Sequence, residues 1–319
     1  MKEPTYCQAF LHAWKAVWHN KILWIFGLFA IFLGQFGFSD VFGKIWTFTD
    51  GSWKDGVWSV FASASVVASG GIWSIIGAIW AILIVLFFIV LAIFLSVTSQ
   101  GALISYTSEW FKNNSYSNIG KSWKRGLSQF WKIFGFNILR KILLFFLILS
   151  MSWAITYFFL SGKIWQNMIF AVLMAVILLV SLFVSILSIF ATCYAVVDGK
   201  GMISALKKSW QLFTEHVFVT LEVGVLLMLM NFLLIALIVA ASFLAFLPSL
   251  LVWVLAGITN YMWLVSLGMI IGLALWILIL VTAAAMFNAF TTSAWVYLFS
   301  KMHKEGMSSK IFHWIKNLF

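Results

Sequence analysis

The sequence predicts an all-α fold, a polytopic α-helical membrane protein with six transmembrane helices. Composition is the first reason. Of 319 residues, 64% are hydrophobic and 9% are charged, and the mean hydropathy is +1.06. A soluble globular domain carries about 25% charged residues. No soluble core hides this much apolar surface, so the composition excludes a soluble protein.

Long stretches without Asp, Glu, Lys or Arg are the second reason. A helix needs about 20 apolar residues to cross a hydrocarbon layer about 30 Å thick. The stretches lack the two-residue alternation of a membrane β-barrel, which leaves helices as the spanning form. The first stretch, Ile22–Ser39, should remain as an anchor because no clean cleavage site follows it. The last, Val223–Ser300, is long enough for two spans. They are Ile22–Ser39, Gly56–Ser108, Ile142–Gly162, Ile164–Val197 and Val223–Ser300.

The turn between the fifth and sixth spans is expected near Pro248, because proline disrupts a helix interior, although a kink within one helix is the alternative. The sixth span is then expected to begin near Tyr261.

The distribution of basic residues predicts the orientation. With six spans, 17 of the 20 Lys and Arg residues fall on one side of the membrane, and only Lys44, Lys54 and Lys163 fall on the other. Positive charge gathers on the cytoplasmic side, so both termini are expected inside, in a prokaryotic cytoplasmic (inner) membrane. The same distribution explains the net charge of +11 without a nucleic-acid partner.

Three segments, each just before a hydrophobic stretch, share one pattern and predict a threefold repeat. They are AFLHAWKAVWHNK from Ala9, SWKRGLSQFWKIF from Ser122 and ALKKSWQLFTEHV from Ala205, aligned without gaps at offsets of 113 and 83 residues. Large apolar residues at spacings of four, four and three form one helical face. These are Tyr6, Phe10, Trp14 and Val17; Ile119, Trp123, Leu127 and Phe130; Met202, Leu206, Trp210 and Phe213.

Small residues lie beside that face at a spacing of four in every copy. This spacing lets helix backbones approach closely, so each amphipathic helix is expected to dock against a neighbouring span, with a chance match of the register as the alternative. The pairs are Ala9 and Ala13, Ser122 and Gly126, and Ala205 and Ser209.

A further aligned position is basic throughout, as His12, Arg125 and Lys208. These three side chains are candidate contacts for lipid headgroups. The alternative is the general positive bias of cytoplasmic segments.

The predicted organisation is therefore one membrane domain over residues 1–319, built from three copies of an amphipathic helix followed by a transmembrane hairpin. The copies cover residues 1–112, 113–198 and 199–302, and Ser117 is a candidate N-cap of the second amphipathic helix. Residues 303–319 are expected to form a further amphipathic helix at the interface.

SALKKSW from Ser204 and AFLHAWKAVWHNKILWIFGLFA from Ala9 resemble the membrane domain found with glycerophosphoryl diester phosphodiesterases and in related uncharacterised prokaryotic membrane proteins. The resemblance spans most of the chain. It implies a membrane fold without hydrolase activity, because that family's chemistry belongs to a separate soluble barrel and no segment here is long or polar enough to form one.

No catalytic, metal or nucleotide motif such as HExxH, GxSxG or GxGxxG is present, and the two cysteines predict neither a disulfide framework nor a metal cluster. No cofactor or metal is therefore expected. Glu222 stands out, because a charge within a span is costly. The offset of 83 places it opposite Leu139, next to Arg140, and we expect a Glu222–Arg140 pair, with interfacial snorkelling as the alternative.

These observations favour a non-enzymatic membrane protein that organises lipid or docks a membrane or cytoplasmic protein partner at the cytoplasmic face. A transporter or channel for a small solute or lipid is the second hypothesis, since repeated units are common in transporters. A lipid-modifying enzyme is the third.

Overall fold

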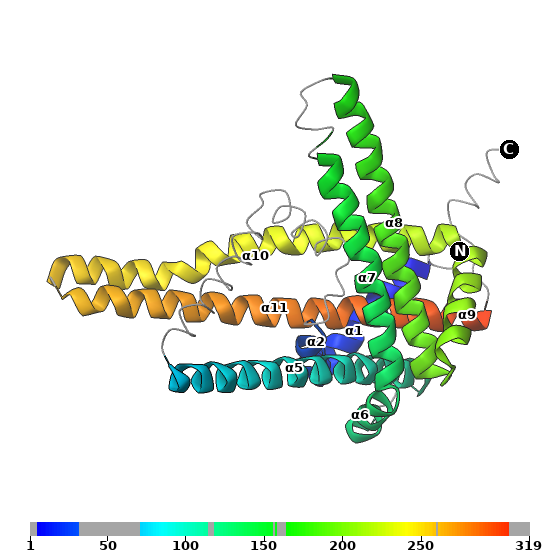
Figure 1. Cartoon of the computed structure of the whole chain (residues 1–319), viewed down its shortest axis with the longest axis horizontal. Helices are drawn as coiled ribbons and strands as arrows, with labels where there is room; N and C mark the ends of the chain where they lie inside the picture. The colour runs from blue at the N-terminus through cyan, green and yellow to red at the C-terminus, as the bar shows by residue number, and fades with distance from the viewer. Residues whose placement is uncertain are drawn as a thin grey trace. The chain divides into compact units, whose positions relative to one another are not determined.

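The computed structural model describes residues 5–31, 71–113, 118–155, 157, 164–259 and 261–305. Its regular elements in these ranges are nine helices, which agrees with the predicted all-α class (Figure 1). They are α1 (Thr5–His19), α2 (Ile22–Ile31), α5 (Ile72–Asn113), α6 (Ile119–Ser128), α7 (Phe130–Ala154), α8 (Ile164–Val197), α9 (Met202–Glu215), α10 (Val217–Thr259) and α11 (Met262–Glu305).

Five helices, α5, α7, α8, α10 and α11, are long and apolar enough to cross a membrane. The predicted fourth stretch coincides with α8 at both ends. The first predicted span begins with the short apolar helix α2, and its remainder, residues 32–39, lies outside the described residues. The chain is therefore a multi-pass membrane protein by helix length and hydropathy.

The predicted outer turn at Pro248 is wrong, because this proline lies inside α10. The chain turns instead between Thr259 and Met262, so the sixth span begins next to Tyr261, as expected. A proline removes one backbone hydrogen bond and pushes against the preceding turn, which bends a helix without ending it when packing holds both halves. Figure 1 shows α10 bending where its colour changes from yellow to gold.

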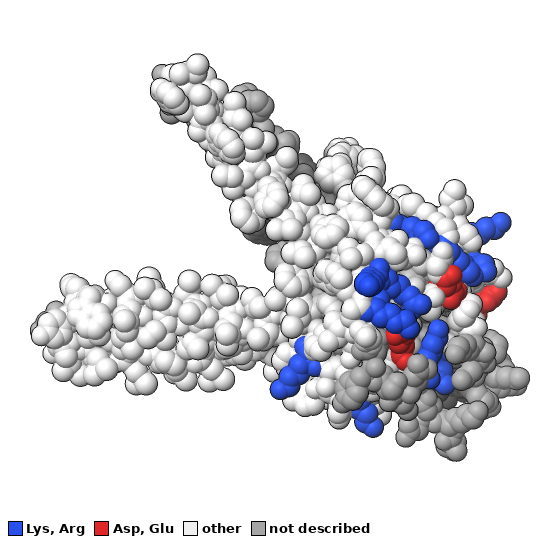
Figure 2. All heavy atoms as spheres, turned by 90° about the horizontal axis from the view of Figure 1, so that it is seen from below, with Lys and Arg blue, Asp and Glu red and all other residues white. Residues whose placement is uncertain are grey.

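The spanning helices expose apolar side chains along most of their length. Trp73 of α5 is 79% exposed and Trp165 of α8 is 78% exposed. In Figure 2 the long projections of the surface are white, so the side in view shows no charged side chain along them. A soluble protein rarely exposes apolar patches of this extent, whereas lipid tails cover them at no cost.

The helices group into two compact units. The first unit holds α1, α2, α10, α11 and the C-terminal part of α5 from Ala102. The second holds the N-terminal part of α5 to Gly101, together with α7, α8 and most of α6 and α9.

Close backbone contact between α2 and α11 organises the first unit. A Cβ on Gly27 would meet the carbonyl oxygen of Ala285 and lie 3.1 Å from the Cβ of Ala289. Nδ2 of the buried Asn288 donates a hydrogen bond of 2.8 Å to the carbonyl of Gly27. An amide within an apolar helix needs such a partner, so this bond sets the register between the two helices.

In the same unit α10 and α11 run side by side (Figure 1). Nε1 of Trp253 donates to the carbonyl of Val265 at 3.1 Å, and Nε1 of Trp276 donates to Oγ of Ser242 at 2.9 Å. Gly268 makes room for Trp253, whose Nε1 would lie 2.7 Å from a Cβ at that position. The hairpin is thus held by polar contacts of tryptophan as well as by apolar packing.

A buried amide pair joins α5 to α7 in the second unit. Nδ2 of Asn137 donates to Oε1 of Gln100 at 2.8 Å and also to the carbonyl of Ile133 at 2.9 Å. Further along, α7 and α8 pack through a small apolar core formed by Leu144, Ile148, Met151 and Ile177.

Candidate functional site

Each of the three predicted amphipathic segments forms a helix that is followed at once by an apolar helix. α1 leads into α2 across Asn20 and Lys21, α6 leads into α7 across Gln129, and α9 leads into α10 across His216. The predicted N-cap of α6, Ser117, lies outside the described residues. Oδ1 of the following residue, Asn118, accepts a hydrogen bond of 3.0 Å from the amide of Gly120 and provides the cap.

The small-residue side of all three helices is buried, as the spacing predicted. Every member of the three pairs has almost no exposed surface. The six residues are Ala9, Ala13, Ser122, Gly126, Ala205 and Ser209.

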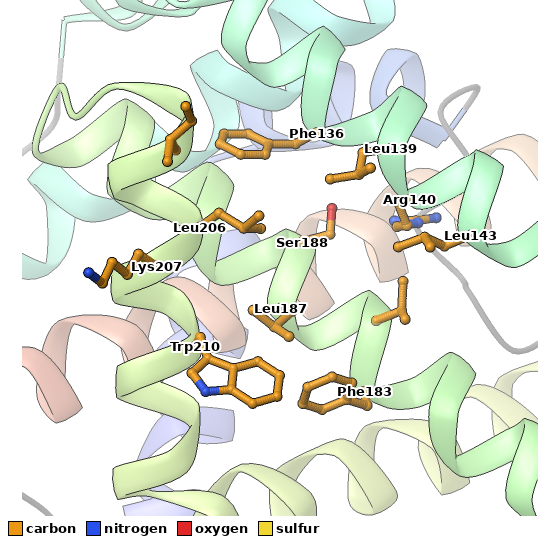
Figure 3. Close-up of a pocket in the computed structure, with 12 residues that line it drawn as sticks. Phe136, Leu139, Arg140, Leu143, Phe183, Leu187, Ser188, Leu206, Lys207 and Trp210 are labelled. Carbon is orange, nitrogen blue, oxygen red and sulfur yellow. The ribbon is translucent and has the colours of Figure 1, made fainter.

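Contacts identify a neighbour for each amphipathic helix. α1 packs against α11, with the rings of Phe10 and Phe290 stacked at 6.0 Å. α6 meets α5, where a Cβ on Gly101 would lie 2.8 Å from the Cα of Gly126. α9 meets α8 through an edge-to-face contact of Phe183 with Trp210 at 5.5 Å (Figure 3). Each neighbour is one of the five helices that are long and apolar enough to cross a membrane, and in α6 a small residue, Gly126, makes the contact.

The large apolar side of these helices remains mostly exposed. Trp14 is 45% exposed, Ile119 is 44% exposed and Trp210 is 54% exposed, whereas Val17 and Phe213 are buried at the C-terminal ends of their rows. The two sides of each helix therefore differ in burial: the small residues are buried, whereas most of the large apolar residues keep part of their side chain exposed. Exposed aromatic residues of this kind are typical of a membrane–water interface.

The three predicted headgroup contacts lie on three different helices. His12 is exposed and stacks on Tyr297 at 5.0 Å between ring centres. Arg125 is half-buried on α6, and Lys208 is exposed on α9. These positions suit interfacial side chains, and their contact with lipid stays a prediction.

A lysine cluster that the sequence did not reveal lies around the turn from Asp198 to Gly201. Nζ of Lys132 donates to the carbonyl of Gly199 at 3.2 Å, and Lys200 pairs with Asp198 at 3.6 Å while lying 5.1 Å from the ring centre of Tyr194. The positive φ of Gly199, 70°, allows the turn that brings these groups together.

The same cluster lowers the pKa of Lys208. The side chain of Lys200 is the largest cause, because Lys208 can accept a hydrogen bond from it only as a neutral amine; the positive charge of Lys200 adds to the shift, while Asp198 opposes it. An ammonium group beside another binds its proton more weakly, so this corner of the second unit favours an added negative charge.

A pocket of about 430 Å³ lies between α7, α8 and α9, within the second unit. Most of its lining is apolar, and the exceptions are Arg140, Lys207 and Ser188 (Figure 3). Sequence reasoning missed it because residues from three helices come together only in the fold. The remaining lining residues are Phe136, Leu139, Leu143, Phe183, Val184, Leu187, Ile203, Leu206 and Trp210.

Arg140 is 2% exposed and belongs to this pocket. Glu222, its predicted partner, is half-buried on α10. The two residues belong to different compact units, and their pairing stays a prediction. Arg140 thus lines a mostly apolar pocket, which the sequence did not predict.

Comparisons with known proteins do not assign the chain to a family. No protein-family model matches the chain, and no curated protein and no solved structure matches it. The fold and the geometry of its sites are therefore the basis for function.

Proposed function

We propose that this protein is a non-enzymatic, multi-pass membrane protein that organises lipid at the cytoplasmic face of a prokaryotic inner membrane. One observation carries the proposal: three amphipathic helices bury their small residues against spanning helices and leave large apolar residues such as Trp14 and Trp210 exposed. An amphipathic helix held in this way inserts its outward apolar side among headgroups and upper acyl chains.

On this proposal the three helices are copies of one unit. The helix breaks at Asn20 and His216 are 196 residues apart, which is also the separation of Ala9 from Ala205 in the repeat alignment. Between α6 and α7 the break comes at Gln129, one helical turn before the aligned residue, Ile133. The agreement of the first and third copies supports the repeat, and the earlier break in the second is a local departure from it.

The same proposal places both termini on the cytoplasmic side of the membrane, where basic residues face anionic headgroups. An even number of spans follows if α2 and the residues after it complete the first span. The resemblance to the membrane domain found with phosphodiesterases fits this proposal, in which the chain supplies a membrane part and no hydrolase.

A depth measurement tests the proposed function. In a Cys7→Ser, Cys193→Ser background, Trp14→Cys and Lys15→Cys place a fluorescent label at two exposed positions of α1, on its apolar and its polar side, about 100° apart around the helix axis. In liposomes containing an anionic lipid, we expect a lipid-borne quencher to quench the label at 14 strongly and the label at 15 weakly. An aqueous quencher should show the reverse order.

Equal quenching at the two positions would contradict the placement of α1 at the headgroup layer. Flux of a trapped solute from the same liposomes addresses the transporter hypothesis, which predicts a leak that depends on protein, whereas a lipid-organising protein leaves the vesicles tight. A label at 14 that only the aqueous quencher reaches would favour a face left open for a protein partner.

A further inference from the structure

We propose that the pocket between α7, α8 and α9 binds one anionic phospholipid of the membrane, with the lipid phosphate at Arg140 and part of one acyl chain against Phe183, Leu187 and Leu206. This inference rests on the proposed function and deepens it, because it assigns a specific lipid class to one site.

The location of the pocket calls for a lipid. Its α7 residues, from Phe136 to Leu143, lie on both sides of Arg140 in the sequence. Arg140 itself comes just before the charge-free stretch that begins at Ile142. Its α8 residues lie inside a charge-free stretch. One side of the pocket therefore lies at the depth of the hydrocarbon and the other at the depth of headgroups, where a lipid presents both parts at once.

Shape and lining favour an acyl chain over a polar solute. Figure 3 shows the rings of Phe183 and Trp210 beside one another along one side, with Leu187 and Leu206 above them and Phe136 across the pocket. A volume of about 430 Å³ falls in the range of small-ligand sites. It is too small to enclose a two-chain lipid, so the rest of the lipid stays in the bilayer.

Charge specifies the headgroup. None of the twelve lining residues is acidic, whereas Arg140 is 2% exposed and Lys207 lies at the rim. A guanidinium has five N–H donors in a planar fork, which matches the geometry of a phosphate. Lys132, Lys200 and Lys208 add positive charge in the same unit, and a basic pocket between membrane helices is a recurring site for anionic lipid headgroups.

The test is a lipid titration of the purified full chain in neutral detergent. Native mass spectrometry counts bound phosphatidylglycerol or phosphatidylcholine, and thermal unfolding reports stabilisation. We expect one tightly retained phosphatidylglycerol per chain and weaker retention of phosphatidylcholine. Removing a single positive charge at the rim with Lys207→Gln should weaken phosphatidylglycerol binding about fivefold.

Two variants separate the apolar part of the site from its charge. Leu187→Trp fills the pocket and should abolish the retained lipid, while its unfolding temperature without lipid shows that it folds. Trp210→Ala should weaken binding, and its matched control Trp131→Ala, at a tryptophan that is 77% exposed and outside the pocket, should not. Lys15→Gln on α1 is the control for Lys207→Gln.

Retention of phosphatidylglycerol by Leu187→Trp and Lys207→Gln at the wild-type level would overturn the pocket assignment. Equal retention of both lipids would overturn the anionic preference. Stabilisation by inorganic phosphate alone that matches that by phosphatidylglycerol would identify the occupant as a soluble anion. Failure of the proposed function is separate, because it appears as equal quenching at positions 14 and 15 of α1, which lies outside the pocket.

Discussion

Gly101 of α5 lies directly against Gly126 of α6, where a Cβ on Gly101 would come within 2.8 Å of the Cα of Gly126 and 2.7 Å of Cδ1 of Ile133. This backbone contact is the clearest case of an amphipathic helix docked on a spanning helix. The Cα of Gly126 belongs to the backbone and cannot move aside as the end of a side chain can, so a larger side chain at position 101 has no space to enter.

Gly101→Val should therefore lower the free energy of unfolding by about 1–3 kcal/mol, because the added carbons force α5 and α6 apart. Thermal unfolding in detergent measures the loss. Gly77→Val is the matched control, since Gly77 lies on the same helix with open space around its Cα. An equal loss in both variants would assign the effect to helix propensity and not to the contact.

The Asn137–Gln100 pair predicts a non-additive effect. Asn137→Leu removes a donor from the buried Oε1 of Gln100 and should cost about 1–2 kcal/mol. Gln100→Leu should cost less stability in the Asn137→Leu background than in the wild-type chain, because the double variant leaves no buried amide unsatisfied. Asn167→Leu, at an exposed position of α8, is the control. Strict additivity in a double-mutant cycle would exclude the pair as a joint contribution.

The predicted Glu222–Arg140 pair is tested in the same way. Glu222→Gln and Arg140→Gln should each lower the unfolding temperature in detergent, because either change leaves one charge without its counterpart at the edge of the membrane. With a pair, the double variant should lose less than the sum of the single losses. A loss equal to the sum means that the two charges act independently.

Repulsion at the lysine cluster predicts a dependence on pH. The pKa of Lys208 lies below its ordinary value of 10.5 because of its hydrogen bond and charge contact with Lys200, so the folded protein binds this proton more weakly than the unfolded chain. The resulting destabilisation is present below the folded pKa and disappears as pH rises through it toward 10.5. Stability contributed by this site thus increases with pH in the alkaline range.

Lys200→Gln should remove that dependence and raise the pKa of Lys208. Acylation of Lys208 by an amine-selective reagent, followed by peptide mass spectrometry across alkaline pH, measures this shift, because only the neutral amine reacts. Lys124→Gln, a change at an exposed lysine of α6, should leave the profile unchanged. An unchanged profile in Lys200→Gln would contradict the contact between the two lysines.

The positions of individual residues show how far sequence reasoning reached. The limits of α8 followed from an uninterrupted apolar stretch, because a bilayer selects helices by length and hydropathy alone. Burial of Ala9, Gly126 and Ser209 followed from their spacing. Pro248 was placed wrongly, because proline is compatible with a turn and with a bent helix, and only packing of α10 against α11 decides between them.

Composition and periodicity by themselves determined that this is a helical, multi-pass membrane protein with amphipathic helices before its apolar helices, since these properties depend on the solvent and on the helical period. The tertiary structure alone decided which spanning helix each amphipathic helix packs against, that Lys132 meets Gly199, and that Arg140 lines an apolar pocket. Such relationships join residues far apart along the chain, and a local pattern cannot specify which distant helix will fill the space beside it.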